Sequence, residues 1–427
     1  MKILFLEIDT ERTWGLTSVG PGYIGSYLRT RGHEAALLRV LPDHKIKEIL
    51  GRIEREAPDI LGFSITTNQW QRAAYVAGEI RKNMDTPVIA GGIHPTFAPL
   101  SVLESDGFDY VCLGEGEEAT YELLSCLEKG DGIYAGQIAN IWVKGSGRPE
   151  MRPPFEPIGE IPFVARDLID EKHGVIHMMT QRGCPFPCTF CAAGAIVDLY
   201  KNTAYIRRRT VDNVLQELRQ IQQQKPLNYV IFLDDTFTIN RAWVKEFCRL
   251  YGREIGTGFS INARVETVNR DMIESLTDAG CRHIVYGVES GSLRVRREIL
   301  NRPLEDRRIM KAFSWTKQAN IMVTANYMIG LPGETPEDID QTLSLNGELE
   351  PDDFECFVFY PYPGTHLFQT CRLKGFLPEN WLKLLSNNRQ SILNMPDLTK
   401  DDIEHYYNIF TKVRENAYTN RYGRALE

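Results

Sequence analysis

Three of the nine cysteines stand close together, with a spacing that suits a metal cluster better than a disulfide. Cys184, Cys188 and Cys191 fall within a stretch of eight residues. Thiolates are the preferred ligands of iron–sulfur clusters, and three of them leave one iron of a four-iron cluster open. A structural zinc site usually has a fourth Cys or His, so zinc is the minor alternative. The other six are read as small buried residues in a reducing compartment: Cys112, Cys126, Cys248, Cys281, Cys356 and Cys371.

The elements around this triplet alternate between short apolar runs and helical patterns, which is typical of βα units with parallel strands. Strands are predicted at residues 175–180, 229–233, 259–263, 283–287, 322–329 and 356–360. Helices are predicted between them at residues 212–223, 241–251, 270–278, 306–318 and 336–346. Catalytic residues of βα barrels lie at the carboxyl ends of the strands, and the cysteine loop follows the first predicted strand.

Polar residues also follow the later strands of this series. Singly, each has a structural explanation, such as a buried ion pair, a helix cap or a turn, and for Asp234 and Glu334 that explanation would prevail. Their order behind the cysteine triplet favours a binding site instead. The candidates are Asp234, Asp235, Arg264, Glu289, Ser290, Gly330 and Glu334, together with Phe190 inside the triplet.

The first third of the chain has a similar alternation. Strands are predicted at residues 3–8, 34–40, 59–66, 87–90 and 110–113, and helices at 20–31, 45–55, 71–82, 99–104 and 117–128. This pattern predicts a parallel, doubly wound sheet, whose ligands bind beyond the carboxyl ends of the strands. No Gly-x-Gly-x-x-Gly follows the first strand, so a dinucleotide site has no support there.

Glycines and polar residues are concentrated in the loops after these strands. Glycine lets the backbone approach a ligand closely, although glycines after strands often only form turns. The candidate ligand-binding residues are Gly20, Tyr23, Ser64, Thr66, Thr67, Asn68, Gln69, Trp70, Gly91, Gly92, His94, Gly114, Glu115 and Gly116.

Taken in order, these loops resemble the cobalamin-binding domain that precedes many radical S-adenosylmethionine (SAM) domains. The resemblance implies that the nucleotide tail of cobalamin is buried along the strand ends, with the Thr66–Trp70 loop below the corrin. Asp43 and His44 are adjacent, so the Asp-x-His-x-x-Gly pattern that places a histidine on cobalt is absent. We therefore expect that no histidine of the protein binds the cobalt of cobalamin. This expectation covers His94. A cofactor-free Rossmann-like scaffold is the alternative.

The Cys-x-x-x-Cys-x-aromatic-Cys motif around Cys184 resembles the signature of the radical SAM superfamily. The resemblance implies an α/β partial (β/α)6 barrel with a [4Fe–4S] cluster whose open iron chelates SAM. The strand-end residues would contact SAM, and Phe190 would pack on its adenine. Both domains in one chain resemble the cobalamin-dependent radical SAM enzymes known as class B methylases. That family implies hydrogen abstraction by a 5′-deoxyadenosyl radical and methyl transfer from methylcobalamin to an unactivated carbon.

Several alternatives and partners follow from this resemblance. The first alternative is a related cobalamin-dependent radical SAM enzyme that cyclises, rearranges or oxidises its substrate without net methylation. A methylthiotransferase is rejected because the first domain offers only Cys112 and Cys126, and a non-enzymatic cobalamin sensor would not need the triplet. A peptide or protein side chain and a small natural product or lipid both stay open as substrates. An electron donor such as flavodoxin or ferredoxin is implied.

Composition sets the wider limits. The chain has 427 residues, 43% hydrophobic and 25% charged, with a net charge of −8, so it is neither disordered nor suited to nucleic-acid binding. No apolar run approaches the ~18 residues of a membrane span, and we expect a cytoplasmic protein. The predicted division is a cobalamin domain at 1–144, a Gly- and Pro-rich linker at 145–172, the barrel at 173–370 and a helical segment at 371–427.

Overall fold

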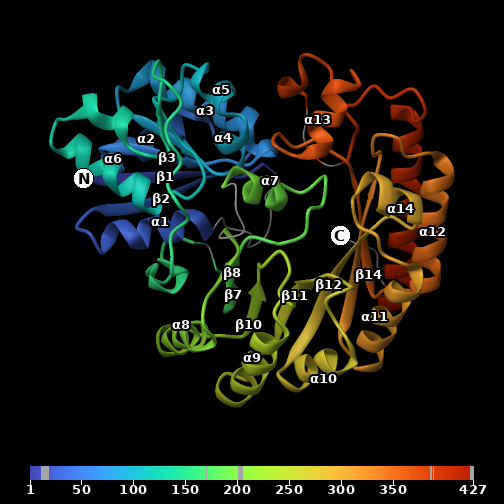
Figure 1. Cartoon of the computed structure of the whole chain (residues 1–427). Coiled ribbons are helices and arrows are strands. Elements are labelled where there is room, and N and C mark those ends of the chain that lie inside the picture. The colour runs from blue at the N-terminus through green and yellow to red at the C-terminus, as the bar shows by residue number, and fades with distance from the viewer. Residues whose placement is uncertain (11–18, 170, 201–204, 385–386, 388, 424–427) are drawn as a thin grey trace. The chain divides into compact units, whose positions relative to one another are not determined.

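The computed structural model describes residues 1–10, 19–169, 171–200, 205–384, 387 and 389–423. The chain divides into two units (Figure 1). Unit 1 comprises Met1–Lys172 and Leu199–Arg207, and unit 2 comprises His173–Asp198 and Arg208–Glu427. Within the described part of the chain, no helix is both long and apolar enough to cross a membrane.

Unit 1 is built on a six-stranded sheet of order β2-β1-β3-β4-β5-β6. The strands are β1 (Lys2–Ile8), β2 (Glu34–Val40), β3 (Ile60–Ser64), β4 (Val88–Gly91), β5 (Tyr110–Cys112) and β6 (Ile141–Val143). The first five are parallel, as predicted, and β6 is an antiparallel edge strand that the sequence analysis missed. Strand order reverses between β1 and β3, which is where ligands of such sheets bind.

Helices cover both faces of this sheet. Helices α1 (Val19–Arg29) and α6 (Glu117–Glu128) pack together, as do α2 (Ile46–Glu56) and α3 (Trp70–Asn83), as Figure 1 shows. Sequence analysis missed α4 (Ile93–Phe97), which starts directly after β4 and precedes the predicted α5 (Pro99–Leu103). Short 3₁₀ turns complete the unit at Thr67–Gln69, Gly132–Gln137 and Ile158–Glu160.

The segment predicted as a linker packs on helix α1. A Cβ on Gly22 would lie 2.7 Å from the Val164 side chain, and one on Gly25 would lie 2.5 Å from that of Leu168. Arg29 also donates to the Asp167 carboxylate at 2.8 Å. These two glycines therefore let the segment lie close against the helix.

Unit 2 has a sheet of six parallel strands in the order β14-β13-β12-β11-β10-β7, so its strands follow one another around a partial barrel. They are β7 (Val175–Met178), β10 (Tyr229–Phe232), β11 (Phe259–Ala263), β12 (Cys281–Glu289), β13 (Met322–Ile329) and β14 (Asp353–Val358). Two short strands, β8 (Gln181–Arg182) and β9 (Arg207–Arg208), lie outside this sheet. The predicted α/β fold class is confirmed.

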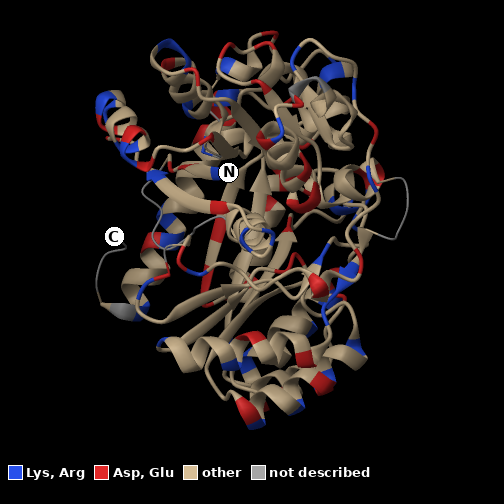
Figure 2. Ribbon diagram, turned by 90° about the vertical axis from the view of Figure 1, so that its left-hand side faces the viewer, with Lys and Arg blue, Asp and Glu red and all other residues tan. Residues whose placement is uncertain are grey.

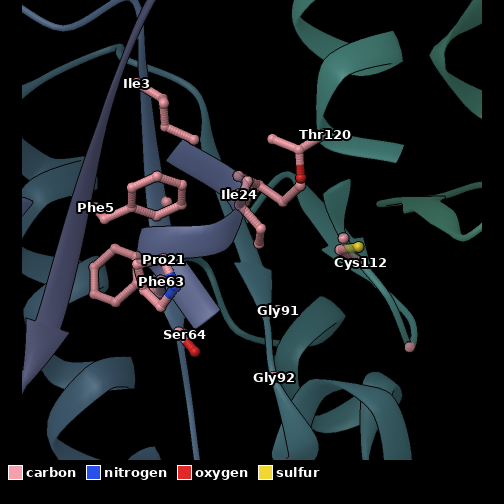
Figure 3. A pocket seen from close by; sticks show the side chains of 14 residues that line it. Ile3, Phe5, Pro21, Ile24, Phe63, Ser64, Gly91, Gly92, Cys112 and Thr120 are labelled. Carbon is pink, nitrogen blue, oxygen red and sulfur yellow. The ribbon is translucent and has the colours of Figure 1, made fainter. Parts of the chain in front are cut away.

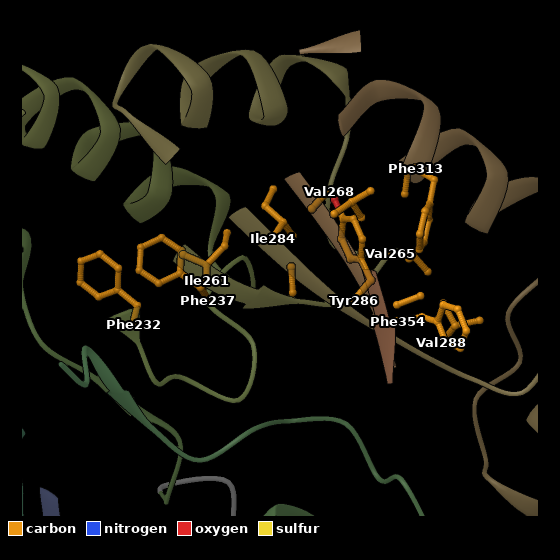
Figure 4. Close-up of a cluster of buried hydrophobic side chains, with 14 of the residues drawn as sticks. Phe232, Phe237, Ile261, Val265, Val268, Ile284, Tyr286, Val288, Phe313 and Phe354 are labelled. Atoms are coloured by element: carbon orange, nitrogen blue, oxygen red, sulfur yellow. The ribbon is translucent and has the colours of Figure 1, made fainter. Parts of the chain in front are cut away.

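The barrel helices are α8 (Val211–Gln224), α9 (Arg241–Glu254), α10 (Arg270–Asp278), α11 (Asp306–Gln318) and α12 (Pro336–Leu349). Alternate strand residues pack against them in a continuous apolar core, in which Figure 4 shows Phe232, Ile261 and Tyr286. Side-chain oxygens of Thr210, Asn240 and Asn269 cap α8, α9 and α10 by accepting backbone N–H groups. Along the helices, Lys and Arg are interspersed with Asp and Glu (Figure 2).

The remaining helices are α7 (Ala192–Leu199), α13 (His366–Leu373) and α14 (Lys400–Tyr422), with a π turn at Val295–Ile299 and a 3₁₀ turn at Trp381–Lys383. Helix α14 packs along β14 and α12 and buries Ile403 and Phe410 in the core. Its Arg414 donates to Asp353 at the start of β14 at 2.7 Å. The C-terminal helix therefore covers the last strand of the sheet.

Candidate functional site

The three clustered cysteines lie in the loop between β8 and α7. Cys184 and Cys188 are each 8% exposed, and Cys191 is partly buried. Thr189 anchors the loop, because its hydroxyl donates to the Ile299 carbonyl at 2.6 Å and its own carbonyl accepts from Leu367 N at 2.9 Å. The loop is thus held against the π turn and the start of α13.

Arg264, at the end of β11, reaches this loop. Its Nη1 donates to the Sγ of Cys188 at 2.9 Å, and its guanidinium carbon lies 3.9 Å from the centre of the Phe186 ring. Glu266 also binds this guanidinium, because Nε of Arg264 donates to Oε1 of Glu266 at 2.7 Å. Sequence analysis assigned Arg264 but missed Phe186 and Glu266. The only feature of the sequence that could have identified them is their position: Phe186 lies between Cys184 and Cys188, and Glu266 lies two residues after Arg264.

The thiols themselves suit a cluster better than a single ion. Burial raises the pKa of Cys191 to about 12, and the nearby thiols of Cys188 and Cys184 add to that rise. Among the described residues, no three Cys, His, Asp or Glu side chains are placed to hold one metal ion. A four-iron cluster is larger than one ion and takes thiolate donors, so the cysteines fit it by type and place.

Glu289, at the end of β12, forms an ion pair with Arg302, a residue that the sequence analysis did not single out. Its backbone has a φ of +69°, and its Oε1 accepts from Nη1 of Arg302 at 2.7 Å. Arg302 also donates to the Gly287 carbonyl at 2.9 Å. Burial raises the pKa of Glu289, and the charge of Arg302 opposes that rise. Arg302 therefore positions the strand end on which Glu289 lies.

Several buried polar atoms at these strand ends have no hydrogen-bond partner within the described residues: Oδ1 of Asn326, Oε2 of Glu266 and Nε of Arg302. Asn326 pairs with Gly287 in the sheet register, and Arg264 follows Ala263, the partner of Tyr286. Asn326 and Arg264 therefore lie near one level of the barrel, on the strands either side of β12. The Glu289 carboxylate and the Arg302 guanidinium occupy the space above Gly287 between them. Unsatisfied buried groups are costly, so this edge fits a polar ligand such as SAM.

Other assigned residues of unit 2 have partners within the protein. Asp234 accepts from the backbone N–H groups of Thr180 and Gln181 at 2.8 and 2.9 Å, and the hydroxyl of fully buried Ser290 lies 3.3 Å from that of Thr342. Gly330, with a φ of +80°, donates to Glu334 at 2.6 Å. Asp234 and Glu334 thus have the structural contacts that the sequence analysis weighed against binding.

Two assigned residues of unit 2 keep accessible surface. Asp235 is exposed, yet surrounding protein and the charge of Asp234 raise its pKa to about 6. Phe190 is partly buried and packs against the barrel core. The side chains of Asp235 and Phe190 are therefore both accessible to a ligand.

Unit 1 has an apolar cavity of about 60 Å³ between helix α1 and the sheet, which runs along β1 and reaches the carboxyl ends of β3, β4 and β5. Figure 3 shows Phe5, Ile24 and Phe63 around it, with Ser64 and Gly91 at the strand ends. Five predicted residues line it: Ser64, Gly91, Gly92, Gly114 and Gly116. It lies where strand order reverses and its walls are mainly apolar, so it fits the buried nucleotide tail of cobalamin.

Two glycines of this cavity are required by the protein's own packing. Gly92 has a φ of +98°, and a Cβ there would lie 2.8 Å from backbone atoms of Ile65. Gly114 has a φ of +70°, and a Cβ there would lie 2.3 Å from the Tyr200 hydroxyl. Gly91 differs, because its Cβ would meet nothing closer than 3.6 Å.

The loop after β3 divides into exposed and buried residues. Thr66 and Asn68 are exposed, whereas Thr67 and Trp70 are buried. Gln69 is partly buried, and its Nε2 donates to the Ile8 carbonyl at 2.7 Å. Thr66 and Asn68 are therefore the members of this loop whose side chains are most accessible.

His94 is fully buried, and both ring nitrogens have neighbours. Nδ1 lies 3.3 Å from the Thr67 hydroxyl and Nε2 lies 3.2 Å from that of Ser101. Its ring stacks on Trp70 with centroids 4.8 Å apart, and burial lowers its pKa to about 4. His94 and Trp70 thus pack as core residues in this structure, and the absence of a histidine on cobalt stays a prediction.

The remaining assigned residues of unit 1 are Gly20, Tyr23 and Glu115. Gly20 and Tyr23 lie in the first turns of α1, where Tyr23 is buried. Glu115 is enclosed by protein, because its carboxylate pairs with Arg207 and accepts from Phe155 N at 2.8 Å. These contacts with the protein itself give the Glu115 carboxylate a structural role in unit 1.

The sequence matches two family descriptions: "Radical SAM superfamily" over residues 178–345 and "B12 binding domain" over residues 16–124. The chain belongs to the cobalamin-dependent radical SAM family. Its cofactors are a [4Fe–4S] cluster, SAM and cobalamin.

Two curated proteins are similar to this chain in sequence, and one solved structure is similar in fold. An uncharacterized methyltransferase of Pyrococcus horikoshii is 28% identical, over 99% of this chain and 93% of the relative. The anaerobic magnesium-protoporphyrin IX monomethyl ester cyclase of Rubrivivax gelatinosus is 27% identical, over 81% of this chain and 65% of the relative. The radical SAM methyltransferase TsrM of Kitasatospora setae has a similar fold, with a TM-score of 0.72, 18% identity and coverage of 88% of this chain and 76% of that one.

Proposed function

We propose that this protein transfers a methyl group from cobalamin to an unactivated carbon of its substrate after hydrogen has been removed from that carbon. The observation that carries this proposal is the contact of Arg264 with Cys188 at the strand ends of a chain that also has a B12-binding domain. When bound, the cofactors supply a one-electron reduction, a carbon-centred radical and a methyl group.

Each part of the chain has a defined task under this proposal. Cys184, Cys188 and Cys191 bind the cluster. Arg264 places a permanent positive charge beside the Cys188 sulfur and holds that side of the cysteine loop. The buried polar groups around Asn326 orient SAM, and an electron donor such as flavodoxin or ferredoxin supplies the electron.

The cobalamin unit has two further tasks. Its apolar cavity takes the nucleotide tail and excludes water from it. Thr66 and Asn68 contact the rest of the cofactor from the strand end. His94 is enclosed by Thr67 and Ser101, so it would not act as a ligand of cobalt when cobalamin is bound.

The second candidate function is cyclisation or oxidation of a small molecule without net methylation. The cyclase of Rubrivivax gelatinosus favours it, since that protein aligns with 81% of this chain. This chain, however, spans only 65% of the cyclase, whereas it spans 93% of the methyltransferase of Pyrococcus horikoshii. We therefore place methyl transfer first.

Product analysis distinguishes the two functions. Anaerobically reconstituted protein with cobalamin, a reductant and methyl-deuterated SAM is incubated with candidate peptides and with small natural products or lipids. Mass spectrometry should find one labelled methyl group on a carbon of the product and an equivalent amount of 5′-deoxyadenosine. A product that has lost hydrogen but carries no label would support the second candidate and contradict the first. The Cys188→Ala variant serves as the inactive control.

A further inference from the structure

Three residues that follow the cysteine motif in sequence belong to unit 1. Tyr200, Tyr205 and Arg207 lie only a helix beyond Cys191, yet the structure groups them with the B12-binding unit. Their contacts centre on the loop between β5 and α6, which contains Gly114, Glu115 and Gly116.

Tyr200 fixes the backbone of this loop. Its side chain is 8% exposed, and its hydroxyl accepts a hydrogen bond from the Glu115 N–H at 2.9 Å. The hydroxyl also occupies the space that a Cβ on Gly114 would need. The ring stacks on Tyr205, with centroids 4.8 Å apart and planes 14° from parallel. The side chain is therefore held at both its ring and its oxygen.

Arg207 fixes the side chain of the same loop. It forms a two-pronged ion pair with Glu115, in which Nη1 donates to Oε2 at 3.1 Å and Nη2 donates to Oε1. Both side chains are more than nine-tenths buried. Nε of Arg207 donates to the Tyr205 carbonyl at 3.1 Å. A planar guanidinium that binds both oxygens of a buried carboxylate fixes its orientation as well as its position.

The loop held in this way forms part of the cavity wall. Cys112, Gly114, Gly116 and Thr120 line the cavity and flank Glu115 on both sides. A shift of the Glu115 backbone would move the glycines next to it. Neither Tyr200 nor Arg207 lines the cavity, so each can act on a ligand there only through this loop.

We propose that Tyr200 and Arg207 are positioning residues of the cobalamin site, which hold the Gly114–Glu115–Gly116 backbone in the shape that receives the cofactor. Glu115 is then the residue they hold and does not contact cobalamin. The proposal rests on cobalamin binding in unit 1, and it assigns part of that site to residues that follow the cluster motif.

The test is a titration of anaerobically reconstituted protein, with its cluster, against hydroxocobalamin, followed by absorbance. Tyr200→Phe removes the acceptor of the Glu115 N–H and keeps the ring. Loss of one hydrogen bond should weaken cobalamin binding about three- to tenfold. Tyr200→Ala also removes the stacked ring and should weaken binding further. Iron content should stay at the wild-type level in Tyr200→Phe. Tyr134→Phe is the matched control, because Tyr134 lies exposed in the same unit and does not line the cavity.

Wild-type cobalamin affinity in Tyr200→Phe would overturn the inference, as would an equal loss of iron and cobalamin. Failure of the wild-type protein to bind hydroxocobalamin would instead contradict the proposed function, so the two failures are distinguishable.

Discussion

Nη1 of Arg264 lies 2.9 Å from Sγ of Cys188, so the end of β11 and the cysteine loop share a hydrogen bond. Guanidinium groups stay protonated in proteins, which gives this contact a permanent positive charge. The two residues are 76 positions apart in the chain. The contact therefore marks the place where the barrel strand and the cluster loop act together.

Replacing Arg264 should separate cluster binding from cluster use. Arg264→Gln keeps a hydrogen-bond donor but loses the charge, so iron content should remain near that of the wild type. The rate of 5′-deoxyadenosine formation should fall about 10- to 100-fold, which is typical for residues that orient metal ligands. Arg253→Gln, on an exposed part of α9, is the control. A wild-type rate in Arg264→Gln would contradict this role.

Iron binding should depend on the clustered cysteines alone. Anaerobic reconstitution should load about four irons per chain, and the triple variant with Ala at Cys184, Cys188 and Cys191 should lose them. Cys126→Ala is the matched control, because that partly exposed thiol lies in unit 1. Iron and sulfide analysis measures both. Retention of the iron in the triple variant would refute the cluster assignment.

The neighbouring glycines of the β4–α4 junction should respond differently to alanine. Gly92→Ala should lower the free energy of unfolding by roughly 1–3 kcal/mol, because of its positive φ and the Ile65 backbone 2.8 Å away. Gly91→Ala should leave stability nearly unchanged, yet its methyl group enters the wall of the cavity and should reduce cobalamin affinity. Urea unfolding of the cofactor-free protein and cobalamin titration measure the two effects. Equal stability of both variants would contradict this reading of the junction.

Cobalt should have no nitrogen ligand from His94. Electron paramagnetic resonance of protein loaded with cob(II)alamin should show no superhyperfine splitting from a lower nitrogen ligand. His94→Gln should give the same spectrum, because His94 is enclosed by Thr67, Ser101 and Trp70. Nitrogen splitting in the wild type that disappears in the variant would show that His94 leaves this packing to bind cobalt.

Glu334 should make unit 2 less stable as pH rises through neutrality. Burial raises its pKa from 4.5 to about 8, even though Gly330 N and Leu331 N donate to it. Between these values the folded protein binds more protons at this site than the unfolded chain, so its contribution to stability falls with rising pH. The slope is about 1.4 kcal/mol per pH unit.

Glu334→Gln keeps an acceptor for the two N–H groups but cannot titrate. The charged neighbours Arg294 and Asp338 and the Cys356 thiol remain in both proteins. Urea unfolding at pH 6.0 and 7.5 should therefore show the wild type losing about 2 kcal/mol relative to the variant. A difference that does not change with pH would place the pKa of Glu334 outside this range.

The elements with strong periodicity followed from sequence alone. Helices α6, α10 and α11 and strands β2, β11 and β13 have the predicted bounds, because each has a clear apolar pattern between well-defined turns. Strand β6 and helices α4 and α7 were missed, since three to eight residues are too few to set a period. The edge strand β6 exists because β5 offers it backbone partners.

The residue types that carry the chemistry also followed from sequence. The triplet Cys184, Cys188 and Cys191 is local, and its spacing alone indicates a cluster. The glycine loops of the first domain are local as well, and five of their residues line one cavity. Such motifs can be read from the sequence because residues a few positions apart stay close in space wherever the rest of the chain lies.

Only the tertiary structure decided which of these residues are enclosed by the protein and which keep accessible surface. Burial in the core gave Trp70 and His94 packing roles, and internal hydrogen bonds did the same for Asp234 and Glu334. Arg302 beside Glu289 and Tyr200 beside Glu115 had no signal in the sequence, because their partners are 13 and 85 positions away. Such pairs form when separate strands and loops meet. A hydrogen bond depends on the distance in space between its two partners and not on their separation along the chain.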